Sequence, residues 1–407
     1  MLFLVALVAP ACGDDDDGGG DADAAADIDA EVPAGPRPSK RSDTGGVAAP
    51  SLGVLAVFGG DDGPIVDQIP SPAYRNDTWV FDPGEGWSEV AGTGPSTRGR
   101  HAVALDSTGP RMLVFGGRFR AAGTTGPYTL YNDLWAFDFT ARTWSQLDDG
   151  AGGPAPRYFA AAAADGAGTF YVYGGGTNTS PTVAQVATDL WMYDGAWSEV
   201  TQSGAVPPSR LFAGYTYDAS RNRLVIFGGQ VGDFVTPARN DLYAVDLATG
   251  EWTQLHAGGN GTGVPSGRFS AMLTYDAAGD RYLMTGGHAD RGVTNDVWSF
   301  DPTGGGWSLA RGADTFTGAA LGCLGNPQEI PANYVDQDVT APERRSGGVF
   351  EIIGDSAWLF GGESDCSDHL DDTWRYDLAA ADWTEILPAR SGESCLRRNE
   401  DCTCLCL

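Results

Sequence analysis

The sequence predicts an all-β protein, a six-bladed β-propeller in which each blade is a sheet of four antiparallel strands. Six hydrophobic runs along the chain each end in a Gly-Gly pair. The first five pairs are 54 to 58 residues apart, and the last interval is 75 residues. A repeat of roughly 50 residues is typical of propeller blades. The pairs begin at Gly59, Gly116, Gly174, Gly228, Gly286 and Gly361.

Each repeat contains four short strands, here named A to D. In the second repeat an apolar segment at 98–105 is followed by a buried-type run at 111–115, an alternating segment at 132–138 and a last strand at 143–147. Turn residues separate the strands and no helical periodicity appears. The same pattern predicts blades at about 41–90, 98–147, 157–200, 210–255, 268–309 and 342–386.

Aromatic residues recur at two positions of the repeat. A sheet of four short strands cannot bury both of its faces alone, whereas six sheets packed face to face can, with large rings between them. Eleven of the twelve tryptophans fall at these positions and Trp358 is extra. The strand-C position holds Trp79, Trp135, Trp191, Tyr243, Trp298 and Trp374, and the strand-D position holds Trp87, Trp144, Trp197, Trp252, Trp307 and Trp383.

Taken together, these features resemble the kelch repeat. The resemblance rests on an Arg before strand A, an apolar run and Gly-Gly after strand B, Asn-Asp-x-Trp-x-Tyr/Phe-Asp in strand C and a Trp in strand D. It covers residues 41–386 and implies a six-bladed kelch β-propeller. Thr188 and Asp371 replace the usual Asn. Tyr243 stands where the pattern has Trp, and Val245 stands where it has Tyr or Phe.

The N-terminal segment predicts export. Residues 1–11 are an apolar run, too short to span a membrane, that ends at Cys12. This resembles a bacterial lipoprotein signal peptide, in which Cys12 would carry the lipid; an ordinary secretion signal is the alternative. Residues 12–40 are rich in Asp, Ala, Gly and Pro and read as a disordered acidic tether. We therefore expect a lipid-anchored protein of the cell envelope, or otherwise a secreted one.

Six further cysteines lie towards the C-terminus, and residues 387–407 form a Cys-rich tail. An even number of cysteines in an exported protein predicts disulfides, which here would join the tail to the last blade and to the loop before it. Metal binding by the tail is the alternative, but it lacks the spacing of zinc sites, so no metal is expected. The candidates are Cys323, Cys366, Cys395, Cys402, Cys404 and Cys406.

Unequal loops point to a binding face. The A–B and C–D turns are short, whereas the B–C and D–A connections, such as 61–75, 118–131 and 310–341, are long and open on one face. Arginines before strand A should ring the channel mouth on that face. They suit an anionic ligand, or alternatively each pairs with the Asp of a neighbouring strand C, such as Asp133 or Asp241, and locks one blade to the next. The candidates are Arg98, Arg100, Arg157, Arg210, Arg268, Arg344 and Arg345, with Arg41 in the first repeat.

Charge and composition limit the remaining functions. The net charge of −29 disfavours nucleic acid as a partner. His101, His256, His288 and His369 lie in different repeats and at different repeat positions, and no nucleophile elbow or zinc motif appears, so we expect no catalytic residues and no cofactor. The sequence predicts a monomeric scaffold that binds a protein or glycan through its long-loop face and meets the membrane only through its lipid. The alternative is an envelope carbohydrate enzyme such as a sugar-acid epimerase.

Overall fold

The computed structural model describes residues 35–63, 65–66, 69–70, 73–121, 126–179, 184–232, 236–289, 292–313, 340–364 and 369–390. All of these belong to one compact unit, Gly35–Leu407. The predicted signal peptide, Cys12, most of the tether and all six disulfide candidates lie outside the described residues. Within these ranges the regular structure is entirely β, and no helix long and apolar enough to cross a membrane occurs.

The first three large sheets are antiparallel meanders built from consecutive stretches of chain. The first contains β1 (Gly45–Ala49), β2 (Val54–Phe58), β5 (Thr78–Asp82) and β6 (Gly86–Glu89). The second contains β7 (Ala102–Asp106), β8 (Arg111–Phe115), β11 (Leu134–Asp138) and β12 (Thr143–Asp148). The third contains β13 (Ala161–Ala164), β14 (Phe170–Tyr173), β15 (Leu190–Tyr193) and β16 (Trp197–Glu199).

The next three sheets repeat this order. The fourth contains β18 (Gly214–Asp218), β19 (Arg223–Phe227), β20 (Leu242–Asp246) and β21 (Glu251–His256), with β17 (Ser203–Gly204) added in parallel at its edge. The fifth contains β23 (Met272–Asp276), β24 (Arg281–Thr285), β27 (Val297–Asp301) and β28 (Gly306–Arg311). The sixth contains β29 (Val349–Ile353), β30 (Ser356–Phe360), β31 (Thr373–Asp377) and β32 (Asp382–Leu387).

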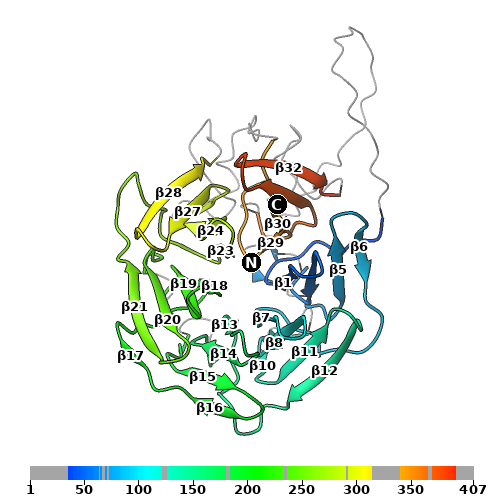
Figure 1. The fold of residues 1–407 in the computed structure, drawn as a ribbon. Helices are drawn as coiled ribbons and strands as arrows, with labels where there is room; N and C mark the ends of the chain where they lie inside the picture. Colours follow the sequence, from blue (N-terminus) through cyan, green and yellow to red (C-terminus); the bar gives the residue numbers. More distant parts are fainter. Residues whose placement is uncertain are drawn as a thin grey trace, which may run out of the picture. The chain divides into compact units, whose positions relative to one another are not determined.

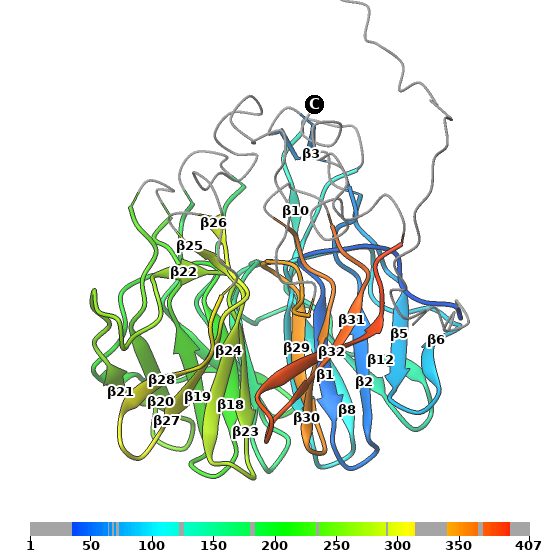
Figure 2. The same cartoon turned by 90° about the horizontal axis from the view of Figure 1, so that it is seen from above.

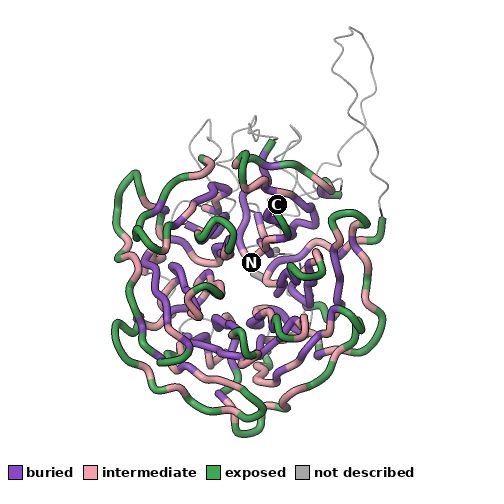
Figure 3. The backbone as a smooth tube through the Cα atoms, in the orientation of Figure 1, coloured by how far each residue is buried: buried purple, intermediate pink, exposed green. Residues whose placement is uncertain are grey.

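These sheets surround a central axis as a β-propeller (Figure 1). Each first strand contacts the first strand of the next sheet, and β29 contacts β1, so the last sheet packs directly on the first. Six apolar clusters fill the six layers between sheets. Burial is greatest near the axis and least at the outer edge, as β13 and β12 illustrate (Figure 3). The all-β class and the propeller architecture are therefore confirmed.

The strand-D tryptophans lie between sheets. Trp87 packs on Phe360 of the last sheet with ring centroids 4.7 Å apart and donates its indole N–H to Thr373 Oγ1. Trp144 likewise donates to Thr78 Oγ1 of the preceding sheet at 2.9 Å. Each of these two rings adds a large apolar contact whose one polar atom is satisfied. The predicted role of this aromatic position in joining sheets is confirmed.

Both glycines of every pair have positive φ. A Cβ on Gly228 would lie 2.6 Å from the carbonyl oxygen of Arg268 in the next sheet, so no other residue fits without a shift of the backbone. The N–H of the second glycine then donates to that same carbonyl, as Gly229 does to Arg268 at 3.0 Å. Gly362 donates in the same way to Arg41, which links the last sheet to the first. The repeat thus needs glycine both for conformation and for close approach of the neighbouring backbone.

Three small sheets, formed largely by the B–C connections, lie on one side of the propeller (Figure 2). The strand pairs are β3 (Ile65–Val66) with β4 (Ile69–Pro70), and β9 (Arg118–Phe119) with β10 (Thr129–Leu130). In the fifth repeat, β22 (Arg268–Phe269), β25 (His288–Ala289) and β26 (Gly292–Val293) form a three-stranded sheet. We call this side the long-loop face.

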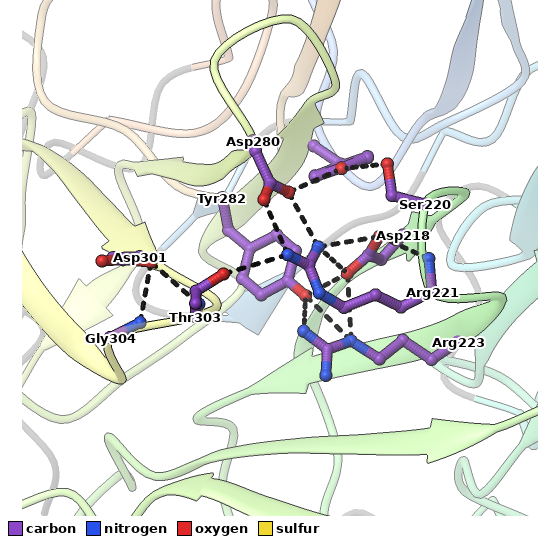
Figure 4. A network of polar contacts seen from close by, with 10 residues as sticks. Asp218, Ser220, Arg221, Arg223, Asp280, Tyr282, Asp301, Thr303 and Gly304 are labelled. Atoms are coloured by element: carbon purple, nitrogen blue, oxygen red, sulfur yellow. Dashed lines mark hydrogen bonds and ion pairs between the residues drawn. The ribbon is translucent and has the colours of Figure 1, made fainter.

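The opposite face carries short turns and at least one polar network between sheets (Figure 4). Arg221, in the β18–β19 turn, binds Asp280 in the β23–β24 turn of the next sheet at 2.6 Å. The Tyr282 hydroxyl donates to the buried Asp218 at 2.5 Å, and Arg223 donates to Tyr282. The hydrogen bonds from Arg221 and Tyr275 lower the pKa of Asp280 to about 2. This network ties the fourth sheet to the fifth by charge as well as by apolar packing.

Asp371 holds the two ends of the described unit together. This residue replaces the strand-C Asn, whose amide in Asn132 and Asn240 instead binds carbonyls of the following D–A connection. The fully buried Asp371 carboxylate forms ion pairs with Arg37 at 3.3 Å and with Arg390 at 3.1 Å. The substitution therefore gives the first and last described segments a common anchor.

Candidate functional site

The arginine before each strand A forms a buried ion pair within its own sheet. Nη1 and Nη2 bind the two oxygens of one carboxylate, and Nη1 also donates to the carbonyl of the first glycine of the pair at 2.9 to 3.1 Å. The shortest N–O distances of the pairs are 2.5 to 2.7 Å. The pairs are Arg41–Asp77, Arg98–Asp133, Arg157–Asp189, Arg210–Asp241, Arg268–Asp296 and Arg345–Asp372.

In four of these pairs the surroundings favour the ionised form of the carboxylate. Burial is the largest influence on Asp133 and acts to raise its pKa. The hydrogen bonds and charge of Arg98, together with the Trp135 indole, outweigh burial and hold the pKa of Asp133 below its usual value. The same causes lower the pKa of Asp77, Asp189 and Asp296.

The six paired arginines expose 3% or less of their surface. The structure therefore makes five of the seven candidate arginines locks within a single sheet, whereas the alternative drawn from the sequence placed such locks between neighbouring blades. Arg344 is also buried, beside Arg345. Of the candidates, Arg100 lines both of the cavities described below and the other six line neither, so the site described below does not depend on those six.

Two residues after each paired arginine, the chain passes closest to the axis with positive φ. The φ angles lie between 51° and 65°, a strained region for the five members that are not glycine. Backbone hydrogen bonds connect successive members, for example from the N–H of Arg100 to the carbonyl of Asp43 at 2.9 Å and from the N–H of Asp43 to the carbonyl of Gly347 at 3.0 Å. We call this set the inner ring: Asp43, Arg100, Phe159, Phe212, Ser270 and Gly347.

Arg100 is the cation of the inner ring. Its Nε donates to Asp43 Oδ2 at 2.5 Å, and its guanidinium carbon lies 4.7 Å from the ring centroid of Phe159 and 6.0 Å from that of Phe212. The pair is mostly buried, with 20% and 11% of the side chains exposed. Since Asp43 neutralises it, Arg100 is a poor primary site for an anion but orders one side of the ring.

Arg118 lies on the long-loop face of the inner ring, directly after Gly116-Gly117. Its Nε donates to the Tyr74 hydroxyl at 2.9 Å, and its guanidinium carbon lies 3.9 Å from the ring centroid of Tyr128 and 5.2 Å from that of Tyr158. Burial, followed by the nearby charge of Arg100, lowers its pKa. Among the described residues no carboxylate forms an ion pair with Arg118.

This arrangement leaves a guanidinium that is held in place but not neutralised by a carboxylate. Tyrosine faces stabilise a cation and fix its plane, yet they supply no negative charge. Arg120, whose guanidinium carbon lies 4.3 Å from the Tyr128 ring, adds a second cation beside the first. A planar guanidinium in such a setting is suited to bind a carboxylate, sulfate or phosphate group.

A carboxyl group that titrates near neutrality lies at the same mouth. Burial, followed by the charges of Asp43 and Asp61, raises the pKa of Glu363 to about 7. Glu363 lines a pocket of about 170 Å³ together with Arg100, Phe212 and His288. Burial also raises the pKa of the Tyr74 hydroxyl to about 12, so that this group stays protonated and accepts from Arg118.

The histidines do not form a metal centre among the described residues, where no group of three or more His, Cys, Asp or Glu side chains is placed to bind a metal. His101 is buried, and burial followed by the charge of Arg98 lowers its pKa to about 3, which keeps it neutral. His288 stacks on Phe269 with centroids 4.8 Å apart. The contact between His288 and Phe269 is that of packed aromatic rings.

Sequence reasoning named the segment 118–131 as a binding loop but did not single out its residues Arg118 and Tyr128, nor Tyr74 or Glu363. The sequence signal that could have identified Arg118 and Glu363 is their position in the repeat. Arg118 and Glu363 each occupy the first place after a Gly-Gly pair, where the other repeats carry Asp61, Gly176, Gln230 and His288. The first residue after Gly-Gly has the same place in every blade but a different side chain in each, so it is a position where a single blade can carry a function of its own.

Comparison with known families identifies the repeat. The model of the KLHDC2/KLHL20/DRC7 kelch-repeats domain matches residues 28–196 and 194–319. The chain belongs to the kelch-repeat family. The resemblance inferred from the repeat residues is thereby confirmed, and kelch repeats support a role in protein binding.

Three relatives show how broadly the kelch region is used. A leucine-zipper-like transcriptional regulator 1 homolog of Drosophila melanogaster is 24% identical over 340 residues, 80% of this chain and 30% of that protein. Human kelch domain-containing protein 10 is 28% identical over 201 residues, 47% of this chain and 43% of that protein. An N-(sulfonatooxy)prop-2-enimidothioate sulfolyase of Thlaspi arvense is 27% identical over 258 residues, 58% of this chain and 68% of that protein. The match to this chain thus spans less than half the length of the Drosophila and human relatives.

Proposed function

We propose that this chain is a six-bladed kelch propeller of the bacterial cell envelope that binds a protein or glycan through its long-loop face. In this proposal Arg118 receives an anionic group of the ligand. The observation that carries it is a mostly buried guanidinium, stacked on tyrosines and without a carboxylate partner among the described residues. The variable loops around it supply the rest of the contact surface. We expect the propeller to act as a monomer.

Replacing Arg118 with Met should weaken binding of acidic ligands while the fold is kept. Loss of a charge-assisted hydrogen bond is worth about 1.5–3 kcal/mol, which corresponds to a drop in affinity of roughly 10-fold to 100-fold. The measurement is binding to an array of acidic peptides and uronic-acid oligosaccharides. The matched control is Arg142→Met, an exposed arginine in a C–D turn on the opposite face. Equal binding of acidic ligands by Arg118→Met and the parent protein would refute this role.

Envelope anchoring is the second part of the proposal. It is supported by the apolar run that ends at Cys12 and by the acidic segment that follows it. With Cys12 lipidated, six cysteines remain for the disulfides that we propose in the C-terminal region. Cys12→Ser should move the protein from the membrane fraction of the host bacterium to the soluble fraction. A variant that stays with the membranes would contradict lipid anchoring.

Sugar-acid chemistry is the alternative function. The observation that favours it is Glu363, whose raised pKa of about 7 suits proton transfer and which lines a pocket with the cation Arg100. One relative carries the name of a lyase for a small sulfonatooxy compound. Incubation with the same uronic acids in deuterated water should then incorporate deuterium at carbon, and Glu363→Gln should stop it. No incorporation by the parent protein across the panel would exclude this alternative.

A further inference from the structure

A second cavity lies along the axis between the inner ring and the short turns of the opposite face. Its volume is about 590 Å³, which is in the range of small-molecule sites. The first strands of the six sheets form its wall. We call it the axial channel, and it is separate from the site at Arg118, because Arg118 and its neighbours Tyr74, Tyr128 and Tyr158 do not line it.

Most of the channel wall is small and apolar. The third sheet contributes Ala162 and Ala163 from the all-alanine strand β13, and the first sheet contributes Gly45 and Gly46 from β1. Short side chains on these two strands leave more room than the larger residues of the other sheets. An occupant would therefore gain its contact area from apolar surface, which favours a hydrophobic body.

One carboxyl group in this wall lacks a countercharge. Asp43 and Asp276, which also line the channel, form ion pairs with Arg100 and Arg281. Glu351, in β29, forms no ion pair with any described residue, and the backbone of Ala48 is the one polar group that offsets the burial of its carboxyl group. An ionised carboxylate in an apolar wall is costly unless a cation reaches it.

The other titratable groups that line the channel are neutral or already form ion pairs. The Tyr215 hydroxyl, from β18, binds the backbone of Val103 at 2.9 Å and stays protonated, because burial and then the Glu351 charge raise its pKa to about 12. His101 is neutral, and Arg100 is paired with Asp43. None of them supplies the missing positive charge.

We propose that the axial channel binds a small organic cation, a primary amine with a hydrophobic body, whose ammonium group donates to the Glu351 carboxylate. The apolar part would lie against the alanines of β13, three places round the ring from β29. Burial raises the pKa of Glu351 to about 8, so this group is largely protonated at pH 7 without a ligand. An ammonium ion would restore its ionisation, and binding would release about one proton.

Isothermal titration calorimetry of the full-length protein with 2-phenylethylamine, hexylamine and tryptamine tests the proposal. We expect at least one of these amines to bind at least about tenfold more tightly than its alcohol counterpart, such as 2-phenylethanol. Titrations at pH 7 in buffers of different ionisation enthalpy should report release of about one proton. Glu351→Gln should remove both the preference for amine and the proton release. Its melting temperature shows that the variant is folded.

Two further variants locate the site. Thr216→Phe narrows the channel from β18 and should weaken the binding of every ligand. Glu199→Gln changes an exposed glutamate of β16 outside the channel and should leave amine binding unchanged. Three results would each overturn the proposal. They are the absence of amine binding at millimolar concentration, equal affinity for amine and alcohol, and unchanged amine binding in Glu351→Gln.

Discussion

Arg345→Met is expected to lower the free energy of unfolding by about 3–5 kcal/mol, the usual cost of leaving a buried charge unpaired. Arg345 and Asp372 are 1% and 0% exposed, the most deeply buried of the six Arg–Asp pairs. The variant would leave Asp372 with the Trp374 indole at 2.8 Å but without its countercharge. It would also leave the carbonyls of Glu343 and Gly361 without the guanidinium as a donor. Urea denaturation followed by tryptophan fluorescence measures the effect.

The control is Asp382→Asn, which removes the partner of Arg311 in a pair whose carboxylate is 64% exposed. Such a pair contributes little, so the change should stay within about 0.5 kcal/mol. Comparable losses in the two variants would mean that burial does not decide the strength of these pairs. In that case the arginines before strand A would not be the locks that we describe.

Glu351→Gln is expected to stabilise the protein at alkaline pH and to flatten its pH profile. The pKa of Glu351 rises from 4.5 to about 8 on folding because burial disfavours the charged form. The native state therefore binds more protons than the unfolded state between these values, and this stabilising contribution is lost as pH rises through 8. Since the side chain keeps some exposure to the channel, we expect a loss on the order of 3 kcal/mol in the parent protein.

The difference between parent and variant isolates this residue, because all other titrations are common to both. It should appear between pH 5 and pH 9 in the free energy of unfolding from urea titrations. Glu199→Gln, an exposed glutamate at the end of β16, is the matched control and should leave the profile of the parent unchanged. A parallel pH profile for the Glu351→Gln variant and the parent would show that Glu351 is ionised equally in both states.

The fold could be predicted from sequence because its determinants repeat. Gly228 stands at the end of β19, as the apolar run before it predicts, and Trp144 pairs with the preceding sheet through a position that recurs in every unit. The ion pair between Arg98 and Asp133 could be proposed on the same grounds. When every sheet needs the same close backbone contact or the same buried ion pair, the residues that form it recur at a regular interval in the sequence.

The candidate site could not be predicted in this way, because its residues differ from one repeat to the next. Arg118 and Glu363 occupy equivalent positions, and only the closed ring brings the long-loop segments of separate sheets to one mouth. Glu351 is a single acidic residue in the apolar strand Val349–Ile353, and its isolation follows from side chains on five other strands. Local patterns do not contain that information.

Because Asp371 brings the first and last described segments together, the chain could begin and end at another place around the ring of sheets. Arg37 and Arg390 meet at one carboxylate, so a short linker could join these two points and new ends could open at another hairpin, such as the turn at 107–110. A circular permutant of this kind would keep every sheet and every layer between sheets. The unit can therefore be displayed or fused from the short turns of the opposite face, with the long-loop face left intact.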